Sequence, residues 1–94
     1  MKVYLISYEL TVYSRRMNQL HSVIKDCAYK DKWVQCFNNL WIIRTEMSKD
    51  EIYDKLKAVF CDSNCFIIIG VTPDCDGWID TSLWDYLNNK IFKD

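Results

Sequence analysis

The chain has 94 residues, of which half are hydrophobic and 27% are charged, with only two glycines and one proline. This length and composition predict one domain over residues 1–94 and exclude collagen-like, linker-like and disordered character. Twelve basic and thirteen acidic residues give a net charge of −1. The chain therefore lacks the basic excess with which most dedicated nucleic-acid binders neutralise phosphate.

The N-terminal part predicts a strand followed by a helix. Val3–Tyr8 is a run of β-branched and aromatic residues, which is typical of a strand. Ser14 can cap a helix over residues 15–28. The apolar positions of this helix follow helical spacing and form one stripe, made of Met17, Leu20, Ile24, Cys27 and Ala28.

The middle of the chain predicts a β-hairpin. Trp33–Phe37 and Leu40–Thr45 are two strand-like runs that only Asn38 and Asn39 separate. Asparagine tolerates the positive φ that a tight two-residue turn demands, so this pair favours a hairpin turn.

The second half predicts a helix, a strand and a last helix. Ser48 and Glu51 have the spacing of a capping box, which begins a helix that ends near Cys61. A turn at residues 62–64 precedes the apolar strand Cys65–Val71. The final helix begins near residue 80 or 81 and carries Leu83, Trp84, Leu87 and Ile91.

This order of elements predicts an α+β fold, namely a ferredoxin-like βαββαβ antiparallel sheet with an added C-terminal helix. The two helices of such a sheet cover one face, yet the central strands are apolar on both sides. The C-terminal helix, a second copy of the chain or a ligand such as nucleic acid could cover the second face. The aromatic residues that we consider as interface candidates are Tyr4, Tyr8, Trp41, Trp78 and Trp84.

Two features near the start of the first helix could carry chemistry. Glu9 is the last residue of the first predicted strand. A carboxylate there can bind a divalent metal, particularly if a dimer brings two such groups together. The alternative is a glutamate that is simply solvated. Arg15 and Arg16 oppose the dipole at a helix N-terminus, so helix stability does not explain them. Arginine suits bidentate phosphate contacts, although two adjacent surface arginines can also be simply solvated. His21 has no recognisable serine, cysteine or carboxylate partner and is interpreted as a partly buried helix residue.

The remaining patterns concern location. The N-terminus lacks the features of a signal peptide, and no segment reaches the roughly 18 apolar residues that cross a bilayer. We therefore expect a cytoplasmic protein without a membrane partner. In that compartment the five cysteines are expected to be free thiols rather than disulfides or a zinc site.

Several short segments resemble the small "SinR-like" proteins, which are grouped as distant relatives of the CRISPR-associated protein two family. The similar segments are Met1–Leu10, Asn39–Thr45 with the Ser48 cap, Asp62–Asn64 and the step from Gly77 to Trp78. The resemblance extends over nearly the whole chain, but its motifs are short and mostly structural.

The resemblance implies a ferredoxin-like homodimer linked to metal-dependent nuclease activity and to spacer acquisition. Arg15, Arg16, Val34 and Gln35 are similar to parts of the family signature, and Glu9 stands where the family has an aspartate. It thus implies Mg²⁺ at Glu9, with Arg15 and Arg16 on nucleic acid. The extra methylene of glutamate displaces the carboxylate by more than about an ångström, which counts against catalysis.

Two main hypotheses of function follow. The first is a homodimer of this type, associated with nucleic acid or a defence system, with at most weak Mg²⁺-dependent endonuclease activity through Glu9. The second is a non-catalytic protein-interaction module, such as a regulator or inhibitor in a bacterial or phage defence system. A ribonuclease toxin is a third interpretation with less support.

Overall fold

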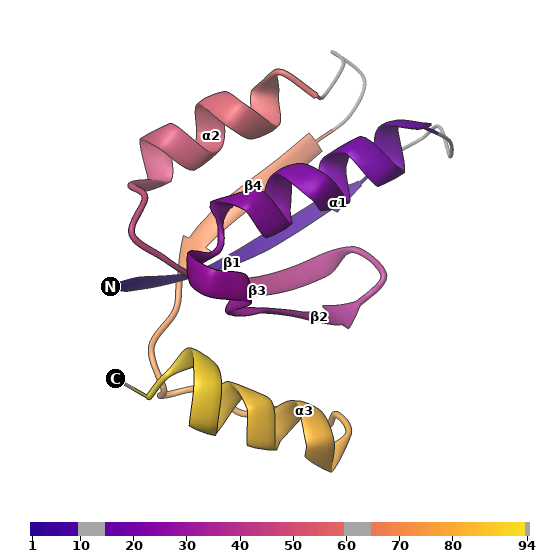
Figure 1. Cartoon of the computed structure of the whole chain (residues 1–94). Coiled ribbons are helices and arrows are strands. Elements are labelled where there is room, and N and C mark those ends of the chain that lie inside the picture. Colours follow the sequence, from indigo (N-terminus) through magenta and orange to yellow (C-terminus); the bar gives the residue numbers. More distant parts are fainter. Residues whose placement is uncertain (10–14, 60–64, 94) are drawn as a thin grey trace.

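Figure 1 shows the computed structural model, which describes residues 1–9, 15–59 and 65–93. The elements in chain order are β1 (Lys2–Glu9), α1 (Arg15–Cys27), β2 (Trp33–Phe37), β3 (Leu40–Thr45), α2 (Lys49–Lys57), β4 (Cys65–Gly70) and α3 (Thr81–Tyr86). A short 3-10 helix, Tyr29–Asp31, precedes β2, and a π-helical turn, Leu87–Ile91, extends α3. The predicted Ser14 cap and the turn at residues 62–64 lie outside the described residues.

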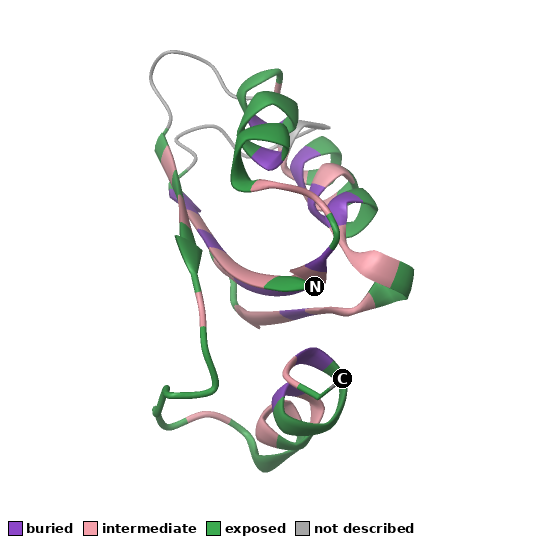
Figure 2. Cartoon of the chain, turned by 90° about the vertical axis from the view of Figure 1, so that its left-hand side faces the viewer, coloured by how far each residue is buried: buried purple, intermediate pink, exposed green. Residues whose placement is uncertain are grey.

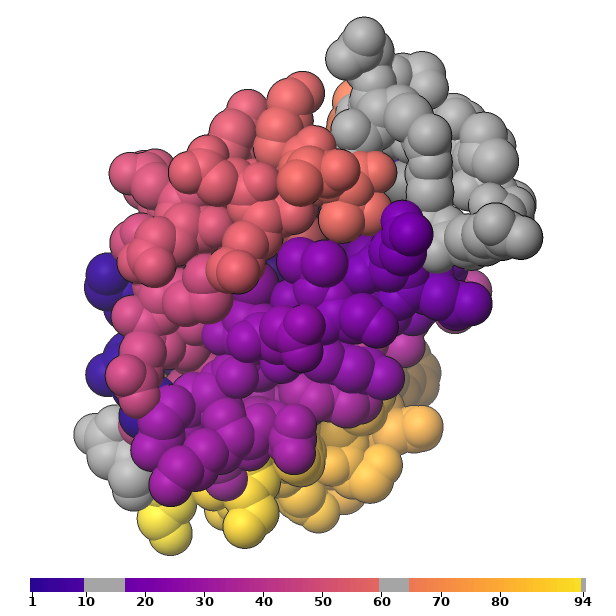
Figure 3. Space-filling model, turned by 45° about the horizontal axis from the view of Figure 1, so that its top comes forward, coloured from indigo at the N-terminus to yellow at the C-terminus, as the bar shows by residue number. Residues whose placement is uncertain are grey.

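The strands form one antiparallel sheet in the order β2-β3-β1-β4. Helices α1 and α2 lie on one face of this sheet, and α3 lies on the opposite face (Figures 1 and 2). The space-filling view shows α1 and α2 side by side over their face (Figure 3). The described chain is thus α+β, with four antiparallel strands and three helices, and is compatible with the ferredoxin-like class.

The alternation of side chains along the strands builds two apolar layers, as the sequence predicts. Ile6 and Ile43 are buried beneath α1 and α2. Ile42 faces the other way and packs with Leu87 and Ile91 from the end of the C-terminal helix. Of the covers considered for the second face, the C-terminal helix takes the part over β2, β3 and the neighbouring side of β1.

Two side chains, Arg44 of β3 and Tyr86 of α3, hydrogen-bond the C-terminal helix to the rest of the fold. Arg44 Nη1 donates to the carbonyl oxygen of Ile91 at 3.2 Å and also to that of Lys93. A cation at the C-terminal end of a helix meets the carbonyl groups that have no partner within the helix. The Tyr86 hydroxyl donates to the carbonyl oxygen of Asp31 at 3.0 Å.

The β2–β3 hairpin has the predicted strand bounds but a different turn. The non-glycine residues with positive φ in the described chain are Lys30 and Asp31, so the expectation of positive φ at Asn38 or Asn39 is wrong. The pairing of β2 with β3 shifts register after Gln35, which adds a residue to one strand. Such an irregularity changes the direction of the strand, so the turn does not need the left-handed conformation.

Helix α2 begins at the predicted capping box. The Ser48 hydroxyl accepts from the Glu51 backbone N–H at 3.2 Å, and the Glu51 carboxylate accepts from the Ser48 backbone N–H at 3.2 Å. No helix in the part of the chain that the structure describes combines the length and apolar character needed to cross a membrane.

Candidate functional site

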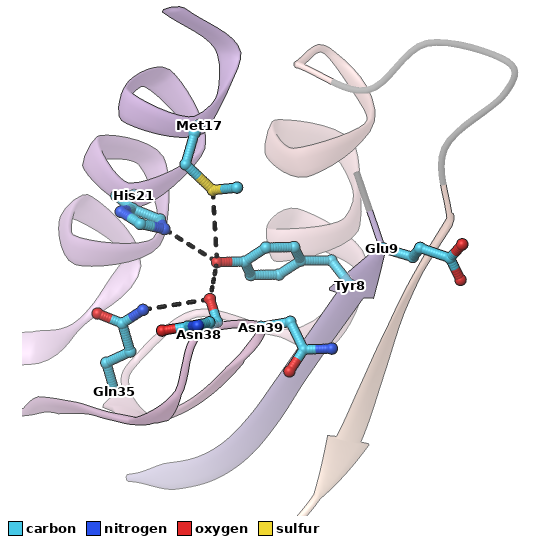
Figure 4. Close-up of a pocket in the computed structure, with 7 residues that line it drawn as sticks. All are labelled: Tyr8, Glu9, Met17, His21, Gln35, Asn38 and Asn39. Carbon is cyan, nitrogen blue, oxygen red and sulfur yellow. Dashed lines mark hydrogen bonds between the residues drawn. The ribbon is translucent and has the colours of Figure 1, made fainter. Parts of the chain in front are cut away.

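The hydroxyl of Tyr8, near the end of β1, is the centre of a polar cluster between α1 and the β2–β3 turn (Figure 4). It donates to the carbonyl oxygen of Asn38 at 2.9 Å, and the Trp41 indole Nε1–H donates to it at 3.3 Å. The His21 Nε2 atom lies 2.9 Å away, and the Met17 sulfur lies 3.9 Å away. One hydroxyl therefore joins β1, α1, β3 and the hairpin turn.

The hydrogen-bonding capacities of these groups determine the tautomer of His21. A carbonyl oxygen can only accept and an indole N–H can only donate, whereas the Tyr8 hydroxyl has a single hydrogen. That hydrogen is donated to Asn38, so the 2.9 Å contact requires a hydrogen on His21 Nε2. His21 then donates to Tyr8, and its Nδ1 atom is an acceptor when the ring is neutral.

Burial keeps both members of this pair uncharged near neutral pH. It lowers the pKa of His21 from its ordinary value of 6.5, and the nearby positive charge of Lys25 lowers this pKa further. Burial also raises the pKa of Tyr8, and the hydrogen bond from Trp41 offsets part of that rise. The cluster thus presents a neutral imidazole and a protonated phenol.

The local sequence explains how these side chains meet. Tyr8 follows Ile6 by two residues, so strand alternation places both side chains on the face that α1 covers. Met17 and His21 are four residues apart and lie on one face of α1. The His21 ring lies 4.9 Å from the Trp41 ring, centroid to centroid, which fixes the imidazole against the core.

A cavity of about 410 Å³ opens beside the Tyr8 hydroxyl. Gln35 Nε2 donates to the Asn38 carbonyl oxygen at 3.2 Å on the hairpin side of this cavity. Figure 4 shows that the Glu9 carboxylate points away from the Tyr8 hydroxyl. The residues that line the cavity are Tyr8, Glu9, Met17, His21, Gln35, Asn38 and Asn39.

Glu9, the predicted metal ligand, is exposed at the end of β1 and is paired in register with Cys65. Strand alternation sends its side chain to the opposite side from Tyr8. Within residues 1–9, 15–59 and 65–93, no group of three or more histidine, cysteine, aspartate or glutamate side chains is placed to hold a metal ion.

Arg15 and Arg16 are the residues predicted to bind nucleic acid. Helix α1 begins at Arg15, but the side chains of Arg15 and Arg16 are outside the described part.

The five aromatic interface candidates divide between the core and the surface. Tyr8 and Trp41 are buried beneath α1, and Tyr4 packs against the same core. Trp84, on α3, is half-buried in the apolar layer between this helix and the sheet. Trp78 is 99% exposed and is thus the one of the five that presents its whole side chain to a partner.

The four cysteines that the structure describes are free thiols. Cys27 is buried and Cys36 is half-buried, and burial raises the pKa of both thiols. Cys65 and Cys75 are exposed, and Cys61 lies outside the described residues.

Sequence reasoning missed most of the cavity. The prediction that His21 is partly buried is confirmed, but its tyrosine partner is thirteen residues away on a different element. The available signals were the inward position of Tyr8 on its strand and the four-residue spacing of Met17 and His21. Asn38 and Asn39 give no comparable signal, because asparagine is common in turns of every kind. Gln35 lies on β2, and no spacing in the sequence marks it as a cavity residue.

Comparisons with protein-family models, with curated proteins and with solved structures found no match to this chain.

Proposed function

We propose that the chain is a ferredoxin-like domain that acts as a homodimer joined along the outer edge of β4. The observation that carries this proposal is the uncovered apolar surface of that strand. Ile67 and Ile69 are 56% and 46% exposed, on the sheet face that α3 covers elsewhere. Strand β4 is also at the edge of the sheet, and its sequence Cys65–Gly70 contains neither charge nor proline. Soluble proteins usually protect an exposed edge strand with charged residues or proline, or cover it with another element.

The sequence of β4 is self-complementary in an antiparallel register. A two-fold axis through Ile68, perpendicular to the sheet, pairs Ile67 with the partner's Ile69 and keeps both side chains on the same face. Two such pairs form by symmetry, and each cross-strand apolar pair contributes roughly 0.2–1 kcal/mol beyond alanine. The added ladder also satisfies backbone groups on the free edge of β4.

This dimer has a consequence for Glu9. Glu9 is opposite Cys65, which is three residues from the axis at Ile68. The two Glu9 positions are therefore offset by six residues along the strands, or about 20 Å. Carboxylates that share one Mg²⁺ ion must each approach it to about 2 Å. A β4 dimer therefore supports a non-catalytic interaction module, in the nucleic-acid or defence setting that the resemblance implies.

The dimer is testable by charge substitution. We expect the native chain at micromolar concentration to scatter light as a particle of twice its 11.3 kDa mass. Ile67→Lys with Ile69→Lys should give a folded monomer, because two buried lysines in the new ladder would have no counter-charge. The matched control is Phe37→Lys, because Phe37 is 54% exposed on the opposite edge strand. A monomeric native chain, or a control that dissociates equally, would contradict the proposal.

A magnesium-dependent nuclease is the second candidate. The observation that favours it is the exposed Glu9 carboxylate, which lines the cavity at the end of β1 and precedes the arginine pair that opens α1. This candidate needs a dimer different from the one proposed above, with the two Glu9 side chains adjacent.

The two candidates differ in their response to Mg²⁺. The β4 dimer separates the two glutamates. We therefore expect no Glu9-dependent cleavage of RNA or DNA in the presence of Mg²⁺: the native chain and Glu9→Gln should give the same result. Glu46→Gln is the control, since Glu46 is an exposed glutamate outside the cavity. Cleavage that a chelator and Glu9→Gln both abolish, and that Glu46→Gln retains, would establish the nuclease and count against the β4 dimer as the functional form.

A further inference from the structure

The cavity beside Tyr8 has the size and the walls of a small-molecule site. Its volume of about 410 Å³ lies within the roughly 300–1,000 Å³ of typical ligand pockets. The Met17 side chain and the His21 ring form one wall from α1, while the hairpin turn forms the other (Figure 4). The site is independent of the β4 edge on which the homodimer proposal rests.

Three of the residues that line the hairpin side of the cavity have carboxamide side chains: Gln35, Asn38 and Asn39. Among the described residues, the one hydrogen bond made by these side-chain amides runs from Gln35 Nε2 to the Asn38 carbonyl oxygen. The Gln35 Oε1 atom and both asparagine amides therefore have hydrogen-bonding capacity left for a ligand. Each carboxamide offers a donor and an acceptor side by side.

The described lining of the cavity is mostly uncharged. The carboxylate that lines it, Glu9, points away from the Tyr8 hydroxyl, and no described lysine or arginine is among the lining residues. Burial keeps His21 uncharged by lowering its pKa. The described lining therefore offers a ligand amide donors and acceptors rather than cations.

We propose that this cavity binds a single unpaired nucleobase. A base is flat, uncharged and edged with alternating donors and acceptors, which glutamine and asparagine amides recognise in pairs. Proteins that recognise unpaired bases combine such edge contacts with stacking on side chains that include histidine. The proposal goes beyond the homodimer, because it names the chemical group that the chain recognises.

The hydroxyl cluster gives this cavity a rigid floor. Tyr8 is held by Asn38, Trp41 and His21, and these contacts fix the hairpin turn relative to α1. The backbone of the turn that carries Asn38 and Asn39 is thus positioned before a ligand arrives, which reduces the entropy lost on binding.

The single histidine of the chain makes the test direct, because His21 gives the one set of imidazole signals in a proton NMR spectrum. The probes are adenosine, cytidine, guanosine and uridine, with ribose and N-methylacetamide as separate probes for the sugar and for a peptide-like amide. We expect at least one nucleoside to shift the His21 signals saturably, with a dissociation constant on the order of 1 mM, about −4 kcal/mol. Ribose and N-methylacetamide should leave the signals unchanged.

Substitutions locate the binding. Gln35→Ala and Asn39→Ala should each weaken nucleoside binding about tenfold or more, by removing one edge contact. Gln19→Ala, an exposed glutamine on α1 outside the cavity, should not change it. Two cavity variants are used so that one misfolded protein, identified by circular dichroism, does not decide the result.

A short single-stranded oligonucleotide distinguishes the source of the base. Tighter binding of pentauridylate or pentaadenylate than of the matching nucleoside identifies a base within a strand, while equal affinity identifies a free nucleoside. The proposal is overturned if no nucleoside shifts the His21 signals, if ribose or N-methylacetamide shifts them equally, or if both cavity variants bind as the native chain does. Light scattering on the same samples reports the homodimer separately.

Discussion

Tyr8→Phe is expected to lower the free energy of unfolding by about 1–3 kcal/mol, although the substitution removes only one oxygen atom. The loss arises because the buried Trp41 indole N–H would have no acceptor, and the His21 Nε2–H would lose its partner as well. An unsatisfied buried donor costs more than the net value of the hydrogen bond that it made. For a domain of this size, each kcal/mol corresponds to roughly 4–8 °C in Tm.

The matched control is Tyr53→Phe. Tyr53 is 48% exposed, and its ring lies 5.4 Å from the Phe66 ring, centroid to centroid. No hydrogen bond of its hydroxyl occurs among the described residues, so we expect a change within about 0.5 kcal/mol. Urea unfolding followed by tryptophan fluorescence measures both variants. Equal stability of the two variants would show that the Tyr8 hydroxyl cluster does not contribute to folding.

Strand positions were predictable because the strand repeat of two residues appears directly in the sequence. Ile6 and Ile42 fall on opposite faces in the structure, as the alternation predicts. Ser48 and Glu51 likewise form the predicted cap, since a capping box depends on residues three apart. Each of these features depends on contacts that are local along the chain or on a fixed period.

The Tyr8 site was not predictable in the same way, because its contacts join residues 13 to 33 positions apart. The contact between Tyr8 and His21 depends on where α1 lies along the sheet, which packing of the whole core determines. Its hydrogen bond to Asn38 depends on the shape of the hairpin turn, and the sequence pattern predicted the wrong backbone conformation there. Glu9, by contrast, was predicted to lie at a strand end, and the structure places it there, with its side chain on the opposite side from Tyr8 as strand alternation requires.

The C-terminal helix shows the same limit at a larger scale. Its apolar residues predicted a helix, but they did not decide among the three possible covers of the second sheet face. In the structure Leu87 and Ile91 are buried against Val34 and Ile42. Contacts from the C-terminal helix thus bury the part of that face over β2 and β3, which makes α3 part of the folded unit rather than an appendage.

That conclusion predicts a large effect for Ile91→Ala. Ile91 is fully buried, and its truncation should lower the free energy of unfolding by about 2–5 kcal/mol through lost burial and the cavity left behind. The matched variant is Ile52→Ala, because Ile52 is an equally buried isoleucine on α2, which lies on the opposite face. We expect losses of similar size in a single unfolding transition.

The comparison of these two variants decides whether the two faces fold together. If α3 belongs to the cooperative unit, Ile91→Ala and Ile52→Ala both shift the midpoint and leave the urea dependence unchanged. If α3 detaches first, Ile91→Ala lowers only an early transition, and the main midpoint stays at the native value. The second result would leave the apolar face of β2 and β3 exposed at moderate urea, and aggregation would increase there. Because Arg44 and Tyr86 hold the helix at two separate points, we expect the first result.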